Sequence, residues 1–245
     1  MKQIDFYGLK LHIGTNEGFF NYLKNHQESR IKLAFINAHC YNVACKDQVY
    51  KEALNSGFDL VLNDGIGVKI GLKMQKESDF DNLNGTDLIP EIIARFGSSK
   101  KVYFLGGQEG VAKQAMENIN KKLNQEVVIG ASSGFINDNK ALINEINASK
   151  AEILVVGMGV PLQEKWINTH FDQLEHISLA VAGGAIIDFM SGRVSRAPKW
   201  MRSLSLEWLY RLLLEPKRLF KRYVVGNFLF VARLLIAKFG SNGNK

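Results

Sequence analysis

The residues of this chain that could do acid–base chemistry stand at the ends of apolar segments. Asp64 closes "DLVLND" and precedes the Gly-rich "GIGVKIG", while Asn37 and His39 follow the apolar segment 31–37. A partly buried carboxylate close to a substrate hydroxyl can act as a general base. Asp64 could equally cap the helix that follows it, and a lone His such as His39 is more often structural than a ligand or base. Both interpretations stay open on these residues alone.

Glycines follow four of the five strand-like segments that bear on this site. Glycine at the carboxyl end of a strand lets backbone N–H groups approach a phosphate and lets a helix start close by. Turns between strands and helices also use glycine for purely conformational reasons, so a single loop is weak support. Together the loops favour phosphate binding by Gly65, Gly106, Gly107, Gly157, Gly159, Gly183 and Gly184.

Polar residues follow two of these glycine turns. In "VVGMGVPLQEKW", Gln163 and Glu164 fall in the first turn of a predicted helix, where they can face a ligand or where the Glu can simply cap. Asp188 follows Gly183-Gly184 and could bind the ribose of a nucleotide. "VYFLGGQEGVA" lacks both the G-x-G-x-x-G spacing and the P-loop G-K-[ST].

We expect the chemistry to need no metal and no other cofactor. The motif "DFD" (Asp79 and Asp81) has the D-x-D form that binds metal in many nucleotide-sugar transferases, but it lies in the charged, loop-like "MQKESDFDNLNG". The sequence has no HExxH, EF-hand or Walker motif. Cys40 and Cys45 do not form a C-x-x-C pair, so we expect reduced thiols in a cytoplasmic protein.

The elements that must position these residues alternate between strands and helices. Apolar, β-branched runs predict strands at 31–37, 59–64, 101–107, 126–130, 152–159 and 177–184, and a hairpin at 3–13 turning near Gly8. Helices are predicted at 42–56, 86–97, 110–123, 138–148 and 163–173. This order predicts an α/β fold with a Rossmann-like, mostly parallel sheet and helices on both faces. Ligands of such sheets bind at the carboxyl ends of the strands.

The basic charge of the chain is confined to its last part. Residues 190–245 hold 12 Lys and Arg and 2 Glu, whereas residues 1–189 hold 19 basic and 22 acidic residues. We therefore predict a catalytic domain over 1–194 and a basic, helical C-terminal appendage over 195–245. A local basic patch of this kind indicates a polyanionic partner.

The appendage has helical periodicity, with Trp and Leu interleaved with Arg and Lys and a break at Pro216. Its apolar content disfavours a nucleic-acid arm and fits a basic amphipathic helix on an anionic membrane surface. The alternative is packing on its own domain or on a second copy in a homo-oligomer. The run "YVVGNFLFVARLLIA" falls short of the ~20 residues that span a bilayer, and we expect no signal peptide.

Taken together, these motifs resemble the bacterial WecB/TagA/CpsF glycosyltransferase family over about residues 4–235. The resemblance rests on "NAHCYNVACKD", "DLVLNDGIGV", "LNGTDLIP", "FLGGQEGVA", "VVGMGVPLQEKWI", "VAGGAIIDFMSGRVSRAPKW" and "LEWLYRLLLEPKRLFKRY". It implies a metal-independent, inverting transferase that is peripheral on the cytoplasmic face of the bacterial membrane. The implied reaction moves a sugar from a UDP-sugar to a polyprenyl-diphosphate-linked acceptor.

The resemblance also implies roles for single residues. Asp64 corresponds to the proposed base, Asn37 to the strand-end Asn, Gln163 to the Gln of G-x-P-x-Q-E and Asp87 to the G-x-D motif. Arg211, Arg218 and Arg222 match the basic residues thought to close over the site. The chain departs from the teichoic-acid branch at Phe35, where that branch has Thr, and at Asn82, where it has Arg. The sequence therefore resembles more closely the capsule and exopolysaccharide members.

The sequence thus predicts an inverting transfer of a hexosyl or N-acetylhexosaminyl group, N-acetylmannosaminyl included. A non-catalytic UDP-binding protein of the membrane surface is the alternative. Nucleic-acid binding through the appendage would show itself as tight, salt-sensitive affinity.

Overall fold

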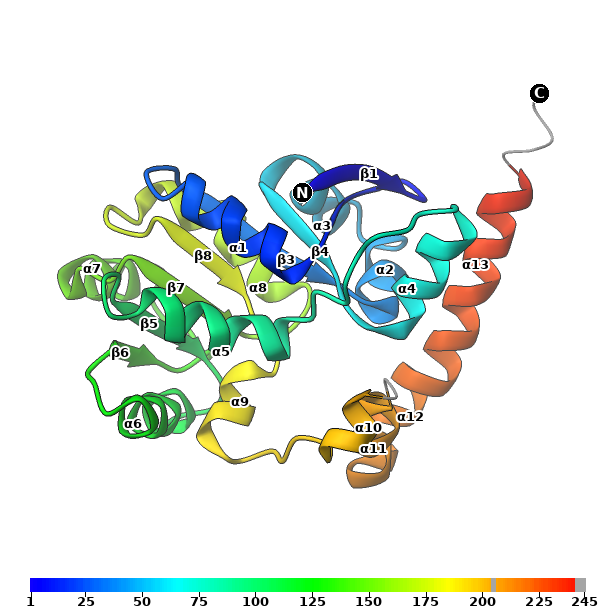
Figure 1. The fold of residues 1–245 in the computed structure, drawn as a ribbon. Coiled ribbons are helices and arrows are strands. Elements are labelled where there is room, and N and C mark those ends of the chain that lie inside the picture. Colours follow the sequence, from blue (N-terminus) through cyan, green and yellow to red (C-terminus); the bar gives the residue numbers. More distant parts are fainter. Residues whose placement is uncertain (204–205, 241–245) are drawn as a thin grey trace.

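The computed structural model describes residues 1–203 and 206–240 and contains one eight-stranded sheet. The strands are β1 (Lys2–Phe6), β2 (Leu9–Ile13), β3 (Ile31–Ile36), β4 (Leu60–Asn63), β5 (Val102–Gly106), β6 (Val128–Ser132), β7 (Ile153–Gly157) and β8 (Leu179–Ala182). They lie in the order β1-β2-β4-β3-β8-β7-β5-β6. All neighbours are parallel except the β1–β2 hairpin, which confirms the predicted mostly parallel sheet (Figure 1).

Helices cover both faces of the sheet, as predicted. One face carries α2 (Ala38–Ala44), α3 (Gln48–Glu52), α7 (Asn139–Ser149) and α8 (Leu162–His170). The other carries α1 (Asn16–Asn25), α5 (Gly85–Phe96), α6 (Val111–Leu123) and α9 (Ile186–Ser191).

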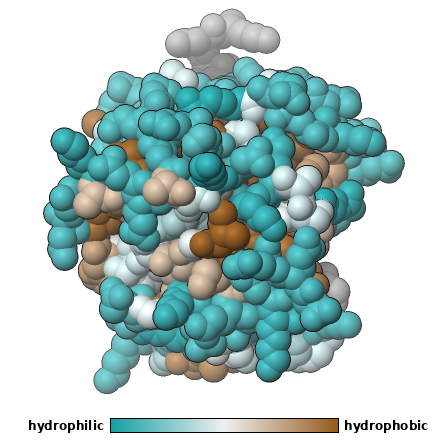
Figure 2. All heavy atoms as spheres, turned by 90° about the vertical axis from the view of Figure 1, so that its left-hand side faces the viewer, coloured by the Kyte–Doolittle hydropathy of each residue, from teal (hydrophilic) through white to brown (hydrophobic). Residues whose placement is uncertain are grey.

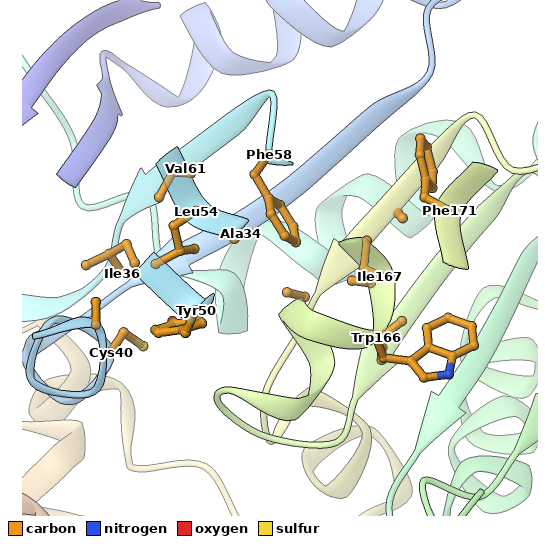
Figure 3. Packing of buried hydrophobic residues seen from close by; sticks show 14 of the residues in the cluster. Ala34, Ile36, Cys40, Tyr50, Leu54, Phe58, Val61, Trp166, Ile167 and Phe171 are labelled. Carbon is orange, nitrogen blue, oxygen red and sulfur yellow. The ribbon is translucent and has the colours of Figure 1, made fainter. Parts of the chain in front are cut away.

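The two layers arise because successive strand residues point to opposite faces. In β3, Ala34 and Ile36 belong to the first layer, whereas Leu33 and Phe35 belong to the second. Figure 3 shows the first layer, in which Tyr50 and Leu54 from one helical segment and Ile167 from another pack against the strands.

Two predicted elements differ from the observed ones, and one observed helix was not predicted. The predicted helix 42–56 is wrong as a single helix: α2 begins at Ala38 because Asn37 caps it, and α3 begins after a second cap, Asp47. Strand β6 starts at Val128, two residues later than predicted. Helix α1 was not predicted, although Thr15 caps it by accepting from the Gly18 N–H at 3.0 Å.

The C-terminal appendage is helical along its described part, which leaves out residues 204–205 and 241–245. It consists of α10 (Lys199–Ser203), α11 (Glu207–Leu214), α12 (Pro216–Phe220), a π-helical turn (Lys221–Val225) and α13 (Gly226–Gly240). Pro216 starts a new helix, as its position predicted. The division at residue 194 stays a prediction.

Helix α13 packs on the α/β domain. Figure 1 shows it along one side of the molecule, beside α2 and α4 (Gly65–Met74). Phe230 is buried with its ring 5.3 Å from that of Tyr41 in an edge-on arrangement. Arg233 Nη1 donates to Asn42 Oδ1 at 2.6 Å, and Asn42 Nδ2 donates to the Gly226 carbonyl at 2.7 Å. The appendage therefore has a fixed place relative to the sheet.

The outer side of the appendage is apolar. We call the exposed large hydrophobic residues from α11 to α13 the appendage apolar set: Leu213, Leu214, Phe220, Val224, Val225, Phe228, Val231, Leu235, Ile236 and Phe239. By contrast, Figure 2 shows that hydrophilic residues cover most of the side of the molecule away from α13. None of the helices in the described part of the chain is long and apolar enough to cross a bilayer.

Candidate active site

A cavity of about 490 Å³ opens where β4, β3, β8, β7 and β5 end, five neighbours in the sheet. The sheet brings most of the predicted site residues to it, although they are far apart in sequence. Those lining it are Asn37, Asp64, Gly107, Gly157, Gly159, Gln163, Gly183, Gly184, Asp188, Arg211, Arg218 and Arg222. The three arginines come from the appendage, which therefore forms one wall of the cavity.

Asp64 does not cap the helix that it precedes. It occupies the N-cap position of α4, but its side chain makes no capping hydrogen bond. Instead Asn82 Oδ1 accepts from the N–H of Gly65 at 2.7 Å. The capping interpretation of Asp64 is thus wrong, and its carboxylate is left facing the cavity.

Asn37 turns its amide nitrogen toward Asp64. Its Oδ1 caps α2 by accepting from the N–H groups of His39 (3.0 Å) and Cys40 (3.1 Å). Because the oxygen is used in this way, Nδ2 points to Asp64 Oδ2, at 3.5 Å. The pair places a carboxylate with a fixed orientation at the floor of the cavity.

The environment of Asp64 suits a base that works near neutral pH. Burial raises its pKa to about 6, and the nearby carboxylate of Glu207 adds to this, while the hydrogen bond from Asn37 and the charges of Arg222 and Arg211 lower it. A carboxylate with this pKa is ionised at pH 7 yet is a stronger base than a solvated one.

Replacing Asn82 with Ala tests how Asp64 is kept free. We expect Asn82→Ala to leave the Gly65 N–H without its acceptor, so that Asp64 turns to cap α4 and transfer falls by about 10-fold. Asn82→Asp, which retains an acceptor oxygen, should keep transfer closer to that of the wild type. Steady-state rates of both variants check this, and equal rates for Asn82→Ala and wild type would contradict it.

Gln163 joins two of the glycine loops. Its Oε1 accepts from the N–H groups of Gly159 (3.2 Å) and Gly184 (2.9 Å). Glu164, the next residue, does not line the cavity but is fully buried behind it. The expectation that Glu164 faces a ligand is therefore wrong, since only Gln163 reaches the cavity.

Two of the three appendage arginines that line the cavity carry donors without partners in the described structure. The Nε atoms of Arg211 and Arg222 are buried and make no hydrogen bond there. Arg218 is different, because its Nε and Nη2 donate to the two carboxylate oxygens of Glu215 at 2.5 and 2.6 Å. Buried, unpaired guanidinium donors at a cavity wall suit an anionic ligand such as a diphosphate.

Four predicted site residues lie outside the cavity lining: His39, Gly65, Gly106 and Asp87. His39 is half-buried, and burial together with the charge of Arg222 lowers its pKa to about 4, so its imidazole is neutral. Asp87 forms ion pairs with Arg196 (2.8 Å) and Arg202 (3.6 Å), which join α5 to the appendage. The geometry gives Asp87 a structural contact, and its role in substrate binding stays a prediction.

Sequence reasoning missed several cavity residues that come from unremarkable stretches. Arg193 lines the cavity and lies 3.9 Å from Asp188. The cavity is also lined by Thr86, Phe135, Leu162 and Phe189. For Arg193 the sequence did contain one signal of a site residue, since this basic residue directly follows a glycine, Gly192.

The motif "DFD" serves as a connector. Asp81 Oδ2 accepts from the Asn16 N–H at 2.8 Å, and Asn63 Nδ2 donates to the Asp81 carbonyl at 2.7 Å, which ties β4 to α1. Within residues 1–203 and 206–240, no three His, Cys, Asp or Glu side chains come together as a metal site would require. Metal independence stays a prediction.

Comparison with known proteins bears on the whole chain. The model of the "Glycosyl transferase WecG/TagA/CpsF family" matches residues 4–244. The chain is 30% identical over 204 residues to an N-acetylglucosaminyldiphosphoundecaprenol N-acetyl-beta-D-mannosaminyltransferase of Bacillus subtilis (strain 168), covering 82% of this chain and 79% of that protein.

Proteins of the same name in two other bacteria are also similar. The identity is 32% over 168 residues in Bacillus spizizenii (68% of this chain, 65% of that protein). It is 27% over 205 residues in Staphylococcus aureus (strain NCTC 8325 / PS 47), covering 83% of this chain and 80% of that protein. A carboxylate, glycine loops and arginines around one cavity agree with these matches, and the chain belongs to the WecG/TagA/CpsF family of glycosyltransferases.

Proposed function

We propose that this enzyme transfers a hexosyl or N-acetylhexosaminyl group from a UDP-sugar to a sugar linked to a polyprenyl diphosphate, with inversion at the anomeric carbon. The observation that carries the proposal is the carboxylate of Asp64. It is held by Asn37 in a cavity whose walls include glycine loops and appendage arginines.

In the proposed reaction Asp64 accepts the proton of an acceptor hydroxyl. The oxygen attacks the anomeric carbon, the bond from that carbon to the diphosphate oxygen breaks, and UDP leaves with the electron pair. The guanidinium groups of Arg211 and Arg222 would stabilise the charge that develops on the diphosphate, because the N–H groups of Gly107, Gly159, Gly183 and Gly184 already donate within the protein. No metal ion is needed for this role if the arginines supply the positive charge.

The names of the relatives support the proposed acceptor class. They are transferases that act on N-acetylglucosaminyldiphosphoundecaprenol and transfer N-acetylmannosamine. The donor sugar of this chain is a separate matter. Phe35 lines the cavity at the position where the teichoic-acid branch has Thr, so the surroundings of the donor differ from those in that branch. We propose the shared reaction class and include N-acetylmannosamine among the candidate sugars.

A donor screen tests the proposal directly. Wild-type protein is incubated with a panel of UDP-sugars and a synthetic prenyl-diphosphate-linked acceptor, with and without EDTA, and products are read by mass spectrometry. We expect one added sugar per acceptor with at least one donor, and an undiminished rate in EDTA. UDP binding without turnover on any donor would favour the non-catalytic alternative. Loss of activity in EDTA would contradict metal independence and make Asp79 and Asp81 candidate metal ligands.

We further propose that the appendage apolar set faces an anionic membrane, where the lipid-linked acceptor lies. Five residues of the set (Leu213, Leu214, Phe220, Val224 and Val225) and the exposed Lys217 and Lys221 lie on the segments that also supply the cavity arginines, and the other five lie on α13, which follows directly. A basic helical surface with apolar side chains binds the membrane interface by inserting the latter among lipids while its cations contact phosphate. The same helices would thus bring the cavity to the acceptor.

Charged substitutions in the appendage apolar set test this contact. We expect the double variant Phe228→Glu with Ile236→Glu to bind anionic phospholipid vesicles at least about 10-fold more weakly in a sedimentation assay. Val49→Glu alters an exposed apolar residue of α3 and serves as the control. If the double variant binds vesicles normally but changes molar mass in light scattering, these residues pack against a second copy instead.

A further inference from the structure

The first turn of α8 holds an acidic side chain that the proposed reaction does not use. Glu164 has no exposed surface, and no other Asp or Glu among the residues that the structure describes is fully buried. Its Oε2 atom has no hydrogen-bond partner there. A buried carboxylate with an unpaired oxygen lowers stability. A native protein retains such a group only for a structural or functional reason, and the cavity lies next to Glu164.

The other carboxylate oxygen of Glu164 faces the cavity wall. Glu164 Oε1 accepts a hydrogen bond from Gln163 Nε2 at 2.8 Å. The side-chain oxygen of Gln163, Oε1, already accepts hydrogen bonds from the backbone N–H groups of Gly159 and Gly184. Because only an oxygen can accept from those two groups, the amide nitrogen must point to Glu164.

This arrangement links two loops through one side chain. Gly159 follows β7, Gly184 follows β8, and both line the cavity. Gln163 is 2% exposed, so its amide hydrogens would lack a partner if residue 164 offered no acceptor. The amide would then turn toward water in the cavity and release both loops.

No Lys, Arg or His among the residues that the structure describes offsets the Glu164 charge. Burial raises the pKa of the Cys40 thiol and that of the Tyr50 hydroxyl. The negative charge of Glu164 raises both pKa values further. Figure 3 shows Cys40 and Tyr50 in the hydrophobic layer that also holds the α8 residues Trp166 and Ile167. Glu164 is therefore held in an apolar layer, with its hydrogen bond directed to Gln163.

We propose that Glu164 is a positioning residue, which accepts the amide of Gln163 and so fixes the spacing of the Gly159 and Gly184 loops around the donor diphosphate. This inference rests on the proposed UDP-sugar transferase function. Glu164 touches no substrate and acts through Gln163.

The test compares Glu164→Leu and Glu164→Gln, with Ile167→Ala as a destabilising control in the same helix. UDP affinity is measured by calorimetry, and transfer kinetics are measured with the full chain. We expect Glu164→Leu to raise the UDP Kd and the donor KM by about 10-fold while the acceptor KM stays unchanged. Glu164→Gln retains an acceptor oxygen and should restore most of the affinity. Ile167→Ala should lower the melting temperature but not the UDP affinity.

A double-mutant cycle with Gln163→Leu separates this role from a general effect on stability. Both residues act through the same hydrogen-bonded link between the Gly159 and Gly184 loops. The double variant Gln163→Leu with Glu164→Leu should therefore bind UDP no more weakly than either single variant. Additive losses would overturn the inference, as would wild-type UDP affinity in Glu164→Leu. Wild-type protein that neither binds UDP nor transfers sugar would overturn the proposed function, and the inference would fall with it.

Discussion

Asp64→Asn is expected to lower kcat for sugar transfer by ~10²–10⁴, the usual contribution of a general base. Asn is nearly isosteric but cannot take the acceptor proton, so UDP affinity should change little. Burial disfavours the charged form of Asp64, whose pKa is about 6 in the folded protein, so the neutral Asn should not reduce stability at pH 8. Transfer within a few-fold of wild type would remove Asp64 from the role of base.

The pH dependence of kcat/KM gives a second measurement of the same residue. Since the base must be ionised, the rate should fall as pH drops through the Asp64 pKa of about 6 and level off above it. Glu207→Gln removes a neighbouring negative charge and should move this limb to lower pH. A limb that does not move would mean that another group controls the rate.

Replacing both Arg211 and Arg222 with Ala is expected to have the second large effect, a fall in kcat/KM of about 10² or more. Both guanidinium groups have buried Nε atoms without partners in the described structure and line the cavity. Their loss should weaken UDP binding and, by raising the Asp64 pKa, move the pH limb upward.

Lys238→Ala removes one positive charge from α13, outside the cavity lining, and serves as the control for that pair. It should leave the UDP Kd, measured by calorimetry, unchanged. Unaltered UDP affinity in Arg211→Ala with Arg222→Ala would show that the appendage arginines do not hold the diphosphate.

The sheet and the floor of the site could be predicted because their signals are local. Apolar, β-branched runs ending in Gly, Asn or Asp mark strand ends, and parallel strands bring those ends to one edge. The predicted helix 42–56 differs from the observed helices because Asn37 caps the earlier start of α2 and Asp47 caps a new helix, α3, within a continuous helical pattern. Helix α1 was missed although its Thr15 cap was present in the sequence.

What the sequence could not show is which way single side chains turn. Whether Asp64 caps α4 depends on Asn82, which lies 18 residues away in sequence and reaches Gly65 only in the folded chain. Glu164 has the pattern of an exposed first-turn Glu, yet the packing of α8 on the sheet buries it. Both outcomes are set by tertiary contacts and not by spacing.

The floor of the cavity also bears on how the enzyme could be redesigned. A Cβ at Gly157, which ends β7 and lines the cavity, would lie 2.9 Å from the Gly184 carbonyl oxygen, and a Cβ at Gly107, just after β5, would lie 2.9 Å from Val111 Cγ1. The floor at β5 and β7 is therefore bare main chain that cannot encode a preference for one sugar. Altered donor selectivity has to be engineered from cavity side chains that lie outside the strands, such as Thr86 and Phe135, where libraries can vary size and polarity without disturbing the sheet.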